Sequence, residues 1–205
     1  LDRLLPELGI NENSVREDGS LAPARLFPDC KAIHLEIGFG SGEHLAALMQ
    51  RHEDNGFIGA EPFINGMSAF LKSIEGLQHR NVRVWMDDAL RLVRSLKPAS
   101  IDSIYILNPD PWPKKRHHKR RIVRQDTLDA YARVLKPGGR LIMTTDVDDL
   151  AGWMCEHAVR HSDFIWCAEK ASEWQNMPEG WVETRYEQKG RQSGRNQTYL
   201  VFQRK

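Results

Sequence analysis

The sequence of 205 residues is 40% hydrophobic and 28% charged, which is typical of one soluble globular domain with a single sizeable core. No apolar run approaches the roughly 20 residues of a membrane-spanning helix, and the N-terminus lacks the pattern of a signal peptide. The three cysteines, Cys30, Cys155 and Cys167, are odd in number and far apart, which indicates reduced thiols rather than a disulfide framework. We therefore expect one cytoplasmic domain over residues 1–205, with no membrane partner and with residues 1–30 as an N-terminal extension.

One basic stretch dominates the charge distribution. Residues 114–124 read KKRHHKRRIVR and hold seven Lys or Arg, two His and no acid. Without these seven, 22 basic residues stand against 28 acidic ones, although the net charge of the whole chain is +1. An acidic body with one basic patch indicates a polyanionic partner that binds at a defined place.

Apolar runs of strand length alternate with helical patterns after the first thirty residues. The predicted strands cover residues 32–37, 57–60, 82–86, 101–107 and 140–145. The predicted helices repeat apolar residues at spacings of three and four, and they cover residues 45–52, 64–75, 121–135 and 150–158. Five alternating strands predict an α/β fold, a doubly wound and mostly parallel sheet with helices on both faces.

The end of the chain breaks this alternation. Residues 164–169 and 197–203 are strand-like, and we predict no helix between them. An antiparallel strand pair is therefore expected to finish the sheet. Because the crossovers between parallel strands are right-handed, a ligand crevice is expected at the carboxyl ends of those strands.

A glycine loop follows the first predicted strand. Gly38, Gly40 and Gly42 allow a tight turn and let a ligand approach the backbone closely. Glu43 stands where a dinucleotide fingerprint has Gly or Ala, and Glu36 places a carboxylate at the mouth of the loop. A carboxylate repels a pyrophosphate and attracts a sulfonium with an α-ammonium group, so the loop favours S-adenosylmethionine over NAD. A turn that binds no ligand is the alternative interpretation.

Two further acids end the next two predicted strands. Glu61 closes the second strand, where it can accept hydrogen bonds from a ribose diol. Asp88 follows the third strand, where it can accept from an adenine amine. The alternative for each is an acid placed at a helix N-terminus by the helix dipole.

A proline-rich loop follows the fourth predicted strand and leads into the basic stretch. Asn108-Pro109-Asp110-Pro111-Trp112-Pro113 has three alternating prolines, which restrict the loop to an extended path. Trp112 offers a stacking surface for a base, and the cations that follow suit phosphates, so this region favours RNA as the partner. A rigid turn with a core tryptophan and a solvated basic face is the alternative; a nuclear-localisation stretch fits the restricted loop less well.

This loop resembles that of the tRNA (guanine-N7-)-methyltransferase family, which reads PDPWxKxRHxKRR at this place. The resemblance runs from about Leu35 to the C-terminus and includes Thr145-Asp146 and Thr184-Arg185-Tyr186-Glu187. It implies a class I, Rossmann-like methyltransferase that moves the methyl group of S-adenosylmethionine to N7 of a tRNA guanine, in the family the variable-loop guanine of position 46. Asn108 and Pro62 depart from the family pattern, and the basic N-terminal segment common in the family is not evident.

The resemblance and the glycine loop together define the expected site. The expected cofactor contacts are Glu36, Gly38, Gly40, Glu61, Asp88 and Asp110. The expected substrate contacts are Lys114, Asp146, Thr184, Arg185, Tyr186 and Glu187. The expected RNA contacts are Arg116, His117, His118, Lys119, Arg120 and Arg121. We further hypothesise that the Asp110 carboxylate is catalytic, because it can orient the guanine and stabilise the positive charge that arrives on its ring.

Two other functions remain open at this point. A methyltransferase that acts on an exocyclic amine through a D/N-P-P-[YFW] loop has a superficially similar sequence, and a non-catalytic RNA-binding module is the more distant alternative. No metal site is expected, because His157 and His161 lie four residues apart but no third ligand accompanies them. Trp174 and Trp181 are interpreted either as part of a lid or as packing residues, and the oligomeric state is left open.

Overall fold

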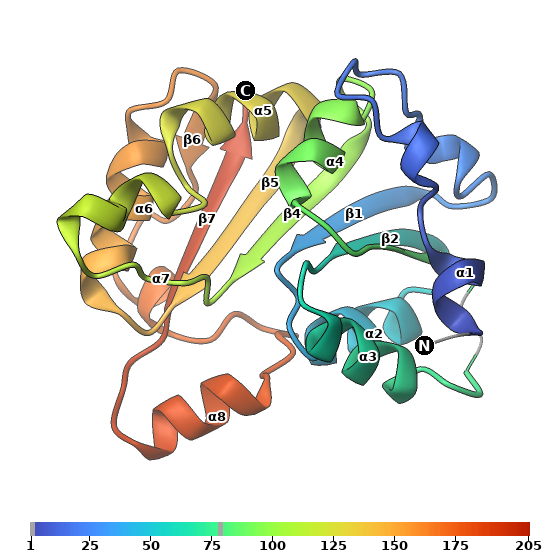
Figure 1. Cartoon of the computed structure of the whole chain (residues 1–205). Coiled ribbons are helices and arrows are strands. Elements are labelled where there is room, and N and C mark those ends of the chain that lie inside the picture. The colour runs from blue at the N-terminus through green and yellow to red at the C-terminus, as the bar shows by residue number, and fades with distance from the viewer. Residues whose placement is uncertain (1–2, 78–79) are drawn as a thin grey trace.

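The computed structural model describes residues 3–77 and 80–205 and has a seven-stranded sheet with helices on both faces (Figure 1). Along the sheet the strand order is β3-β2-β1-β4-β5-β7-β6. The strands are β1 (Ala32–Ile37), β2 (Asn55–Ala60), β3 (Val82–Trp85), β4 (Ile101–Leu107), β5 (Leu135–Thr145), β6 (Phe164–Trp166) and β7 (Thr198–Arg204). The first five are parallel, whereas β7 is antiparallel to both β5 and β6. The predicted doubly wound sheet with an antiparallel C-terminal pair is confirmed.

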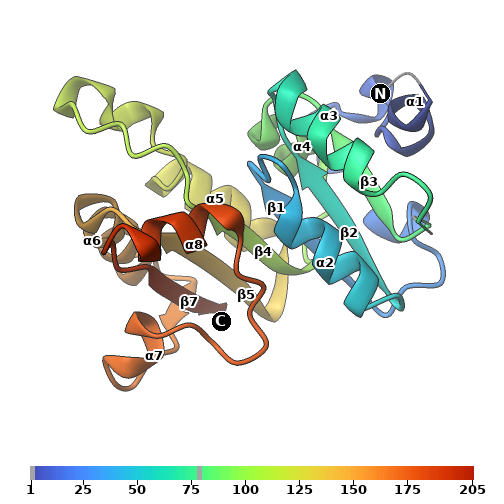
Figure 2. The same cartoon turned by 90° about the horizontal axis from the view of Figure 1, so that it is seen from below.

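The helices connect the parallel strands and cover both faces of the sheet (Figure 2). The α-helices are α1 (Leu4–Leu8), α2 (Glu43–Arg51), α3 (Ile64–Ser73), α4 (Ala89–Ser95), α5 (Gln125–Val134), α6 (Asp148–Val159), α7 (Ser172–Gln175) and α8 (Arg185–Gln192). Three short 3-10 helices are η1 (Glu12–Ser14), η2 (Pro23–Arg25) and η3 (Lys115–Arg120). The N-terminal segment covers the β3 edge of the sheet, where the amide of Ile10 donates to the carbonyl of Val84 at 2.8 Å.

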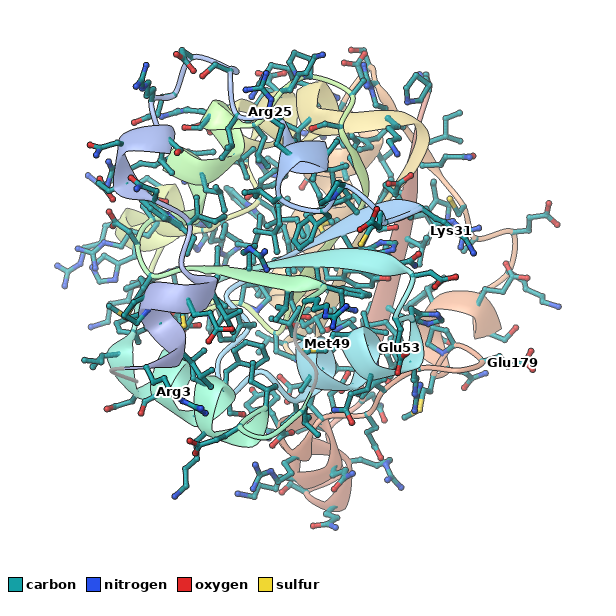
Figure 3. The ribbon with its side chains drawn as sticks, turned by 90° about the vertical axis from the view of Figure 1, so that its right-hand side faces the viewer. Arg3, Arg25, Lys31, Met49, Glu53 and Glu179 are labelled. Carbon is teal, nitrogen blue, oxygen red and sulfur yellow. The ribbon has the colours of Figure 1, made fainter. Side chains whose placement is uncertain are left out.

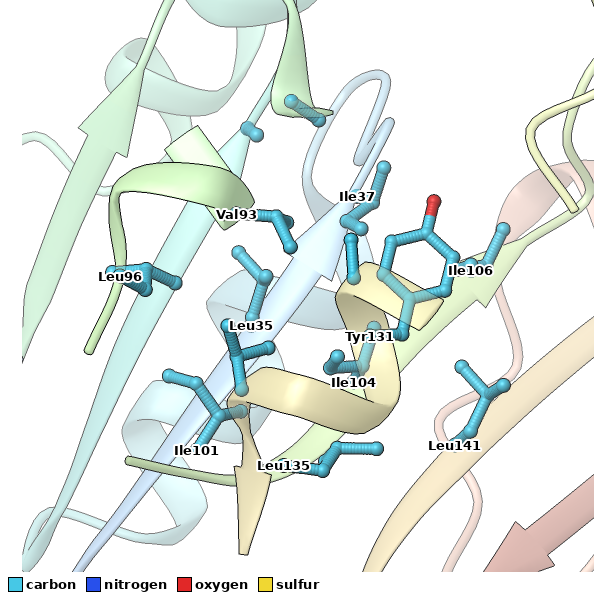
Figure 4. Packing of buried hydrophobic residues seen from close by; sticks show 14 of the residues in the cluster. Leu35, Ile37, Val93, Leu96, Ile101, Ile104, Ile106, Tyr131, Leu135 and Leu141 are labelled. Atoms are coloured by element: carbon cyan, nitrogen blue, oxygen red, sulfur yellow. The ribbon is translucent and has the colours of Figure 1, made fainter. Parts of the chain in front are cut away.

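Two apolar clusters form the core, one on each face of the sheet. Because side chains alternate along a strand, Leu35 and Ile37 of β1 share one face, where Figure 4 shows them with Ile104 of β4 and Tyr131 of α5. The other cluster packs α2 and α3 on the sheet and includes Met49 of α2, which is 1% exposed. Figure 3 labels Met49 on α2, close to Glu53, which follows the end of the helix.

The topology places a crevice between two particular loops. The chain runs outward from β1 in both directions, so the strand order reverses between β1 and β4. Ile37 pairs with Ile106, so the two strands end side by side. The loops after β1 and β4 therefore face each other at the switch point, the place where parallel α/β sheets bind ligands.

Several predicted boundaries are corrected by the structure. The helix predicted over residues 121–135 begins only at Gln125, because Arg121 has an extended backbone and residues 115–120 form η3. Strand β5 begins at Leu135 instead of residue 140, and an irregular register opposite Ile101 and Ser103 accommodates Pro137 and Gly138.

The interpretation of the tail was also incomplete. Helices α7 and α8 lie between β6 and β7, where no helix was predicted. Helix α8 reads RYEQKGRQ and has no apolar period that would mark it. Its capping box, Thr184 with Glu187 three residues later, is the sequence signal that predicts its N-terminus.

Candidate active site

Two cavities open next to each other at the carboxyl ends of β1 and β4. Their common wall is formed by Gly38, Gly40, Ser41 and Asn108. The larger cavity, of about 810 Å³, continues past Glu61, Asp88, Asp110 and Trp112. The smaller cavity, of about 450 Å³, is bounded by Glu36 and His44 on one side and by Thr184, Arg185, Tyr186 and Lys189 on the other. The structure thus gathers most of the predicted site around the switch point.

The glycine loop has the geometry of a ligand cradle. Gly38 and Gly40 have φ angles of 69° and 56°, a region that side chains rarely adopt. A methyl group built on either residue would meet nothing within 4 Å, so both glycines face open space. At Gly42, in contrast, a methyl group would lie 2.3 Å from the ring of Phe70, so that glycine is required by packing against α3.

Glu61 holds the glycine loop from the end of β2. One carboxylate oxygen accepts from the amide of Gly40 and the other accepts from the amide of Phe63, both at 2.9 Å. The side chain is 4% exposed and lines the larger cavity. Its contact with a ribose stays a prediction, and its support of the loop is a role that the sequence did not reveal.

Asp88 has the helix-capping role that was the alternative interpretation. Its carboxylate accepts from the amide of Leu90 at 2.8 Å at the start of α4. Its own amide donates to the carboxylate of Asp87 at 2.7 Å. Both acids line the larger cavity, so the cap and the predicted cofactor contact are compatible, and the second stays a prediction.

The loop after β4 is restrained at both ends. Asn108 and Trp112 have φ angles of 48° and 43°, unusual for residues with side chains. The Asn108 side chain accepts from the amide group of Gln197 at 2.7 Å, which ties this departure from the family pattern to the chain just before β7. Asp110 is exposed on the wall of the larger cavity and, within the described part of the chain, makes no hydrogen bond or ion pair. Its carboxylate is therefore available to a ligand.

Most of the basic stretch lies on the surface. Residues 114–120, in yellow-green in Figure 2, project from the body of the domain. The guanidinium of Arg120 lies 4.8 Å from the ring centre of Trp112, and the ring of His117 lies edge-on to Trp112 at 5.9 Å. Lys114, Arg116 and Lys119 are exposed, as RNA or substrate contacts would need to be.

Arg121 does not belong to this surface. Its side chain is 1% exposed, its Nε donates to the carbonyl of Pro111 at 2.9 Å, and its guanidinium lies 4.8 Å from the ring centre of Trp153. It also forms an ion pair with Asp149 of α6, and this hydrogen bond lowers the pKa of the Asp149 carboxyl. The prediction that Arg121 contacts RNA is wrong for this structure, because its guanidinium is buried and bonds to both the proline-rich loop and α6.

His118 is also turned inward. It is half-buried against Trp153, with the two ring centres 5.1 Å apart. Its Nε2 atom is shielded from solvent and has no hydrogen-bond partner among the described residues. His118 therefore packs at the base of the basic stretch, and its contact with RNA stays a prediction.

Helix α8 forms the far wall of the smaller cavity, below the edge where β1 and β4 end (Figure 1). The amide of Arg185 donates to Glu43 of α2 at 2.7 Å, and their side chains form an ion pair. The hydroxyl of Tyr186 donates to the Asp146 carboxylate at 3.2 Å, and burial raises the pKa of Tyr186. Asp146 is 3% exposed in its side chain and pairs with Arg195 at 3.1 Å, so it acts on the cavity through Tyr186.

Glu187 is another predicted contact that the structure corrects. It is 3% exposed and does not line the smaller cavity. One of its oxygens accepts from the amide and the hydroxyl of Thr184, at 2.7 and 3.0 Å, and the other accepts from the indole of Trp181 at 3.2 Å. Its carboxylate therefore caps α8, and Trp181 packs behind the cavity.

Comparison with known proteins identifies the family. Residues 30–200 match the family described as a putative methyltransferase. A tRNA (guanine-N(7)-)-methyltransferase of Rhizobium meliloti (strain 1021) is 44% identical, over 100% of this chain and 87% of the relative. One of Agrobacterium fabrum (strain C58 / ATCC 33970) is 43% identical, over 100% and 88% of the two chains. The chain belongs to the tRNA (guanine-N(7)-)-methyltransferase family.

The fold of this family member is shared with more distant methyltransferases. The aminoglycoside resistance methyltransferase NpmB1 superposes with a TM-score of 0.58 at 16% identity, over 89% of this chain and 92% of that one.

In the described ranges, 3–77 and 80–205, no group of three His, Cys, Asp or Glu is placed to hold a metal ion. No described helix has the length and apolarity needed to cross a membrane.

His44 is the residue of the site that sequence reasoning missed. Its Nδ1 lies 2.7 Å from the Glu36 carboxylate, and the two side chains are 2% and 4% exposed. Both line the smaller cavity. The sequence shows only a histidine in the first turn of an amphipathic helix, and no motif there announces a pair with Glu36.

Proposed function

The chain belongs to a family that methylates N7 of a tRNA guanine. We propose that it takes the methyl group from S-adenosylmethionine, and that the guanine is the variable-loop residue of position 46. The observation that carries the proposal is the pair of cavities that share the glycine-loop wall. One reaction needs a cofactor and a base side by side, and the two cavities provide adjoining spaces. The exposed cations of residues 114–120 lie on the same side and suit an RNA backbone.

The residues present fit the cofactor. Gly38 and Gly40 leave open space where a side chain would stand, so an extended ligand can lie against the loop. In the larger cavity, Glu61 and Asp88 offer acceptors to the donors of an adenosine, while Asp110 stands at another part of the wall. Glu36 borders the smaller cavity, where a carboxylate suits an α-ammonium group.

The bound cofactor supplies an electrophilic methyl group on a positively charged sulfur. Guanine N7 already has an in-plane lone pair, so no residue has to remove a proton before attack. The bond from N7 to the methyl carbon forms as the bond from carbon to sulfur breaks. The work left to the protein is alignment and exclusion of water, which the restrained loops after β1 and β4 provide.

Asp110 is the residue we assign to the charge that moves. In the transfer, positive charge passes from sulfur to the purine ring. An exposed, unpaired carboxylate on the cavity wall can orient the guanine by accepting from its N–H groups and can stabilise that charge. The rigidity of the proline-rich loop keeps this carboxylate in place without reorganisation.

Identification of the product nucleoside tests the proposal. The protein is incubated with methyl-labelled cofactor and unmodified tRNA, which is then digested to nucleosides. We expect 7-methylguanosine, and its loss when position 46 of the tRNA is changed from G to A. A product methylated on an exocyclic amine would assign the chain to the other class of RNA methyltransferase. Binding of tRNA with no cofactor binding and no product would assign it to RNA binding alone.

A further inference from the structure

The smaller cavity contains a buried pair that the mechanism above does not use. Glu36 and His44 face each other at 2.7 Å with almost no exposed surface. The two side chains share this hydrogen bond through Nδ1 of the ring. This bond links the orientation of the Glu36 carboxylate to the plane of the His44 ring.

The His44 ring also lies near the segment that leads into α8. Its centre lies 5.2 Å from that of the Trp181 ring. The indole of Trp181 donates to Glu187, whose other oxygen accepts from Thr184 at the start of α8. A continuous series of contacts therefore runs from Glu36 through His44 and Trp181 to the cap of α8.

The residue next to His44 holds the same helix directly. Glu43 accepts from the amide of Arg185 and forms an ion pair with its guanidinium. Two consecutive residues in the first turn of α2 thus hold the two walls of the smaller cavity, Glu36 on one side and α8 on the other. A shift of α2 or of the His44 ring must change both walls together.

We propose that His44 is a positioning residue that couples binding of the cofactor at Glu36 to binding of tRNA at α8. The proposal rests on the function proposed above, in which Glu36 meets the cofactor and α8 meets the substrate. A cofactor that bonds to Glu36 fixes the carboxylate, the carboxylate fixes the His44 ring, and the ring fixes Trp181 and the cap of α8. Because coupling between two sites is reciprocal, tRNA on α8 must tighten cofactor binding by the same factor.

The test measures the affinity for S-adenosylhomocysteine, which cannot react, by calorimetry with and without saturating unmodified tRNA. In the parent protein we expect tRNA to tighten this affinity about fivefold or more, the usual range for coupled sites. A parent protein that binds both ligands with equal affinity alone and together overturns the proposal.

Two substitutions separate the two contacts of His44. His44→Asn keeps an N–H near the position of Nδ1 but removes the ring, so the affinity for S-adenosylhomocysteine alone stays near that of the parent while the effect of tRNA disappears. His44→Phe keeps a ring against Trp181 but removes the hydrogen bond to Glu36, so the affinity for the ligand alone falls about tenfold. An effect of tRNA that is unchanged in both variants overturns the coupling role.

Matched variants guard against trivial outcomes. His52→Asn changes an exposed histidine at the other end of α2 and should leave both affinities as in the parent. Trp181→Phe keeps the ring contact and removes only the donor to Glu187, so it should weaken the effect of tRNA even if the His44 variants fail to fold. If the parent protein forms 7-methylguanosine but the His44 and Trp181 variants keep its full coupling, the proposed function stands and only this inference fails.

Discussion

The loops after β1 and β4 both shape the wall of the cavities, but one is built from glycines and the other from prolines. Each leaves a parallel strand at the switch point and forms part of the common wall of the two cavities. The first is built from glycines with positive φ angles and is held by the buried carboxylate of Glu61. The second is restricted by prolines and is held by the buried guanidinium of Arg121. In each loop, one buried charged side chain forms hydrogen bonds with backbone groups of the loop and so restrains it.

The comparison also separates support from chemistry. On the glycine side, Glu61 both supports the loop and lines the cavity. On the proline side the tasks fall to two residues, because Arg121 supports the loop from inside and Asp110 faces the cavity. In the second loop, substitutions should therefore affect the methyl-transfer rate and the free energy of unfolding at different residues. In the first loop, a substitution of Glu61 should affect both ligand binding and the support of the loop.

The largest effect is expected at Asp110. Asp110→Asn keeps the size of the side chain and one acceptor but removes the charge, so methyl transfer should slow about 10²–10³-fold, as for loss of one preorganised electrostatic group. The free energy of unfolding should not change, because the carboxylate has no partner among the described residues. Single-turnover kinetics on enzyme saturated with cofactor measures the rate. Transfer at the parent rate by the folded variant would remove Asp110 from the mechanism.

Arg121 should show the opposite profile from Asp110. Arg121→Met removes the hydrogen bond to Pro111 and the ion pair with Asp149, so the free energy of unfolding should fall by about 1–3 kcal/mol. Transfer should slow about 10–100-fold because the loop no longer holds Asp110 in place. Urea unfolding and single-turnover rates measure the two effects. Arg120→Met, at an exposed neighbour, is the matched control, and equal stability of the two variants would contradict the support role.

Glu61 should combine the two effects at a smaller scale. In Glu61→Gln the amide group faces one of the two backbone donors that the carboxylate now satisfies, Gly40 and Phe63. The affinity for S-adenosylhomocysteine should fall about tenfold, the cost of one unmatched polar group. Calorimetry measures it, and Glu53→Gln, at an exposed residue after α2, should bind as the parent does (Figure 3). Unchanged affinity in Glu61→Gln would argue that the loop holds its shape without this carboxylate.

The smallest effect belongs to the surface of the second loop. If Arg120 contacts a phosphate, Arg120→Ala should reduce the slope of log affinity for tRNA against log salt by about one unit. Arg25→Ala removes another exposed arginine, in η2, and should leave the slope unchanged (Figure 3). Equal slopes in both variants would leave the Arg120 cation as a partner of Trp112 alone.

The sheet was predictable because its strands are buried on both faces. Residues 32–37 and 101–107 were predicted as strands from apolar runs, and they match β1 and β4 in full. The glycine loop and the acids after the strands were predictable for a related reason, since parallel strands deliver their ends to one edge. The local sequence pattern was enough to predict the strands and the residues that directly follow their ends.

The parts that escaped prediction depend on contacts between distant residues. Arg121 is a surface residue by type, and only Pro111, Trp153 and Asp149 together make a buried place for it. Helix α8 is polar throughout and is held by Glu43, which lies 142 residues from Arg185. The role of His44 likewise depends on its contacts with Glu36 and Trp181. Glu36 and Pro111 lie near His44 and Arg121 in the sequence, but Trp181, Asp149 and Trp153 lie too far along the chain for a local pattern to reveal the contacts.

The place of β7 in the sheet has a consequence for how the protein is made. Strand β7 lies between β5 and β6 and pairs with both. Strand β6 can therefore join the sheet only after residues 198–204 have left the ribosome. The residues that line the glycine loop and the larger cavity, up to Ile122, are synthesised before those of α8. Helix α8 and the strand behind it come last, with long closure distances that slow their docking. A nascent chain therefore acquires the wall for the nucleotide end before it acquires the wall that α8 supplies.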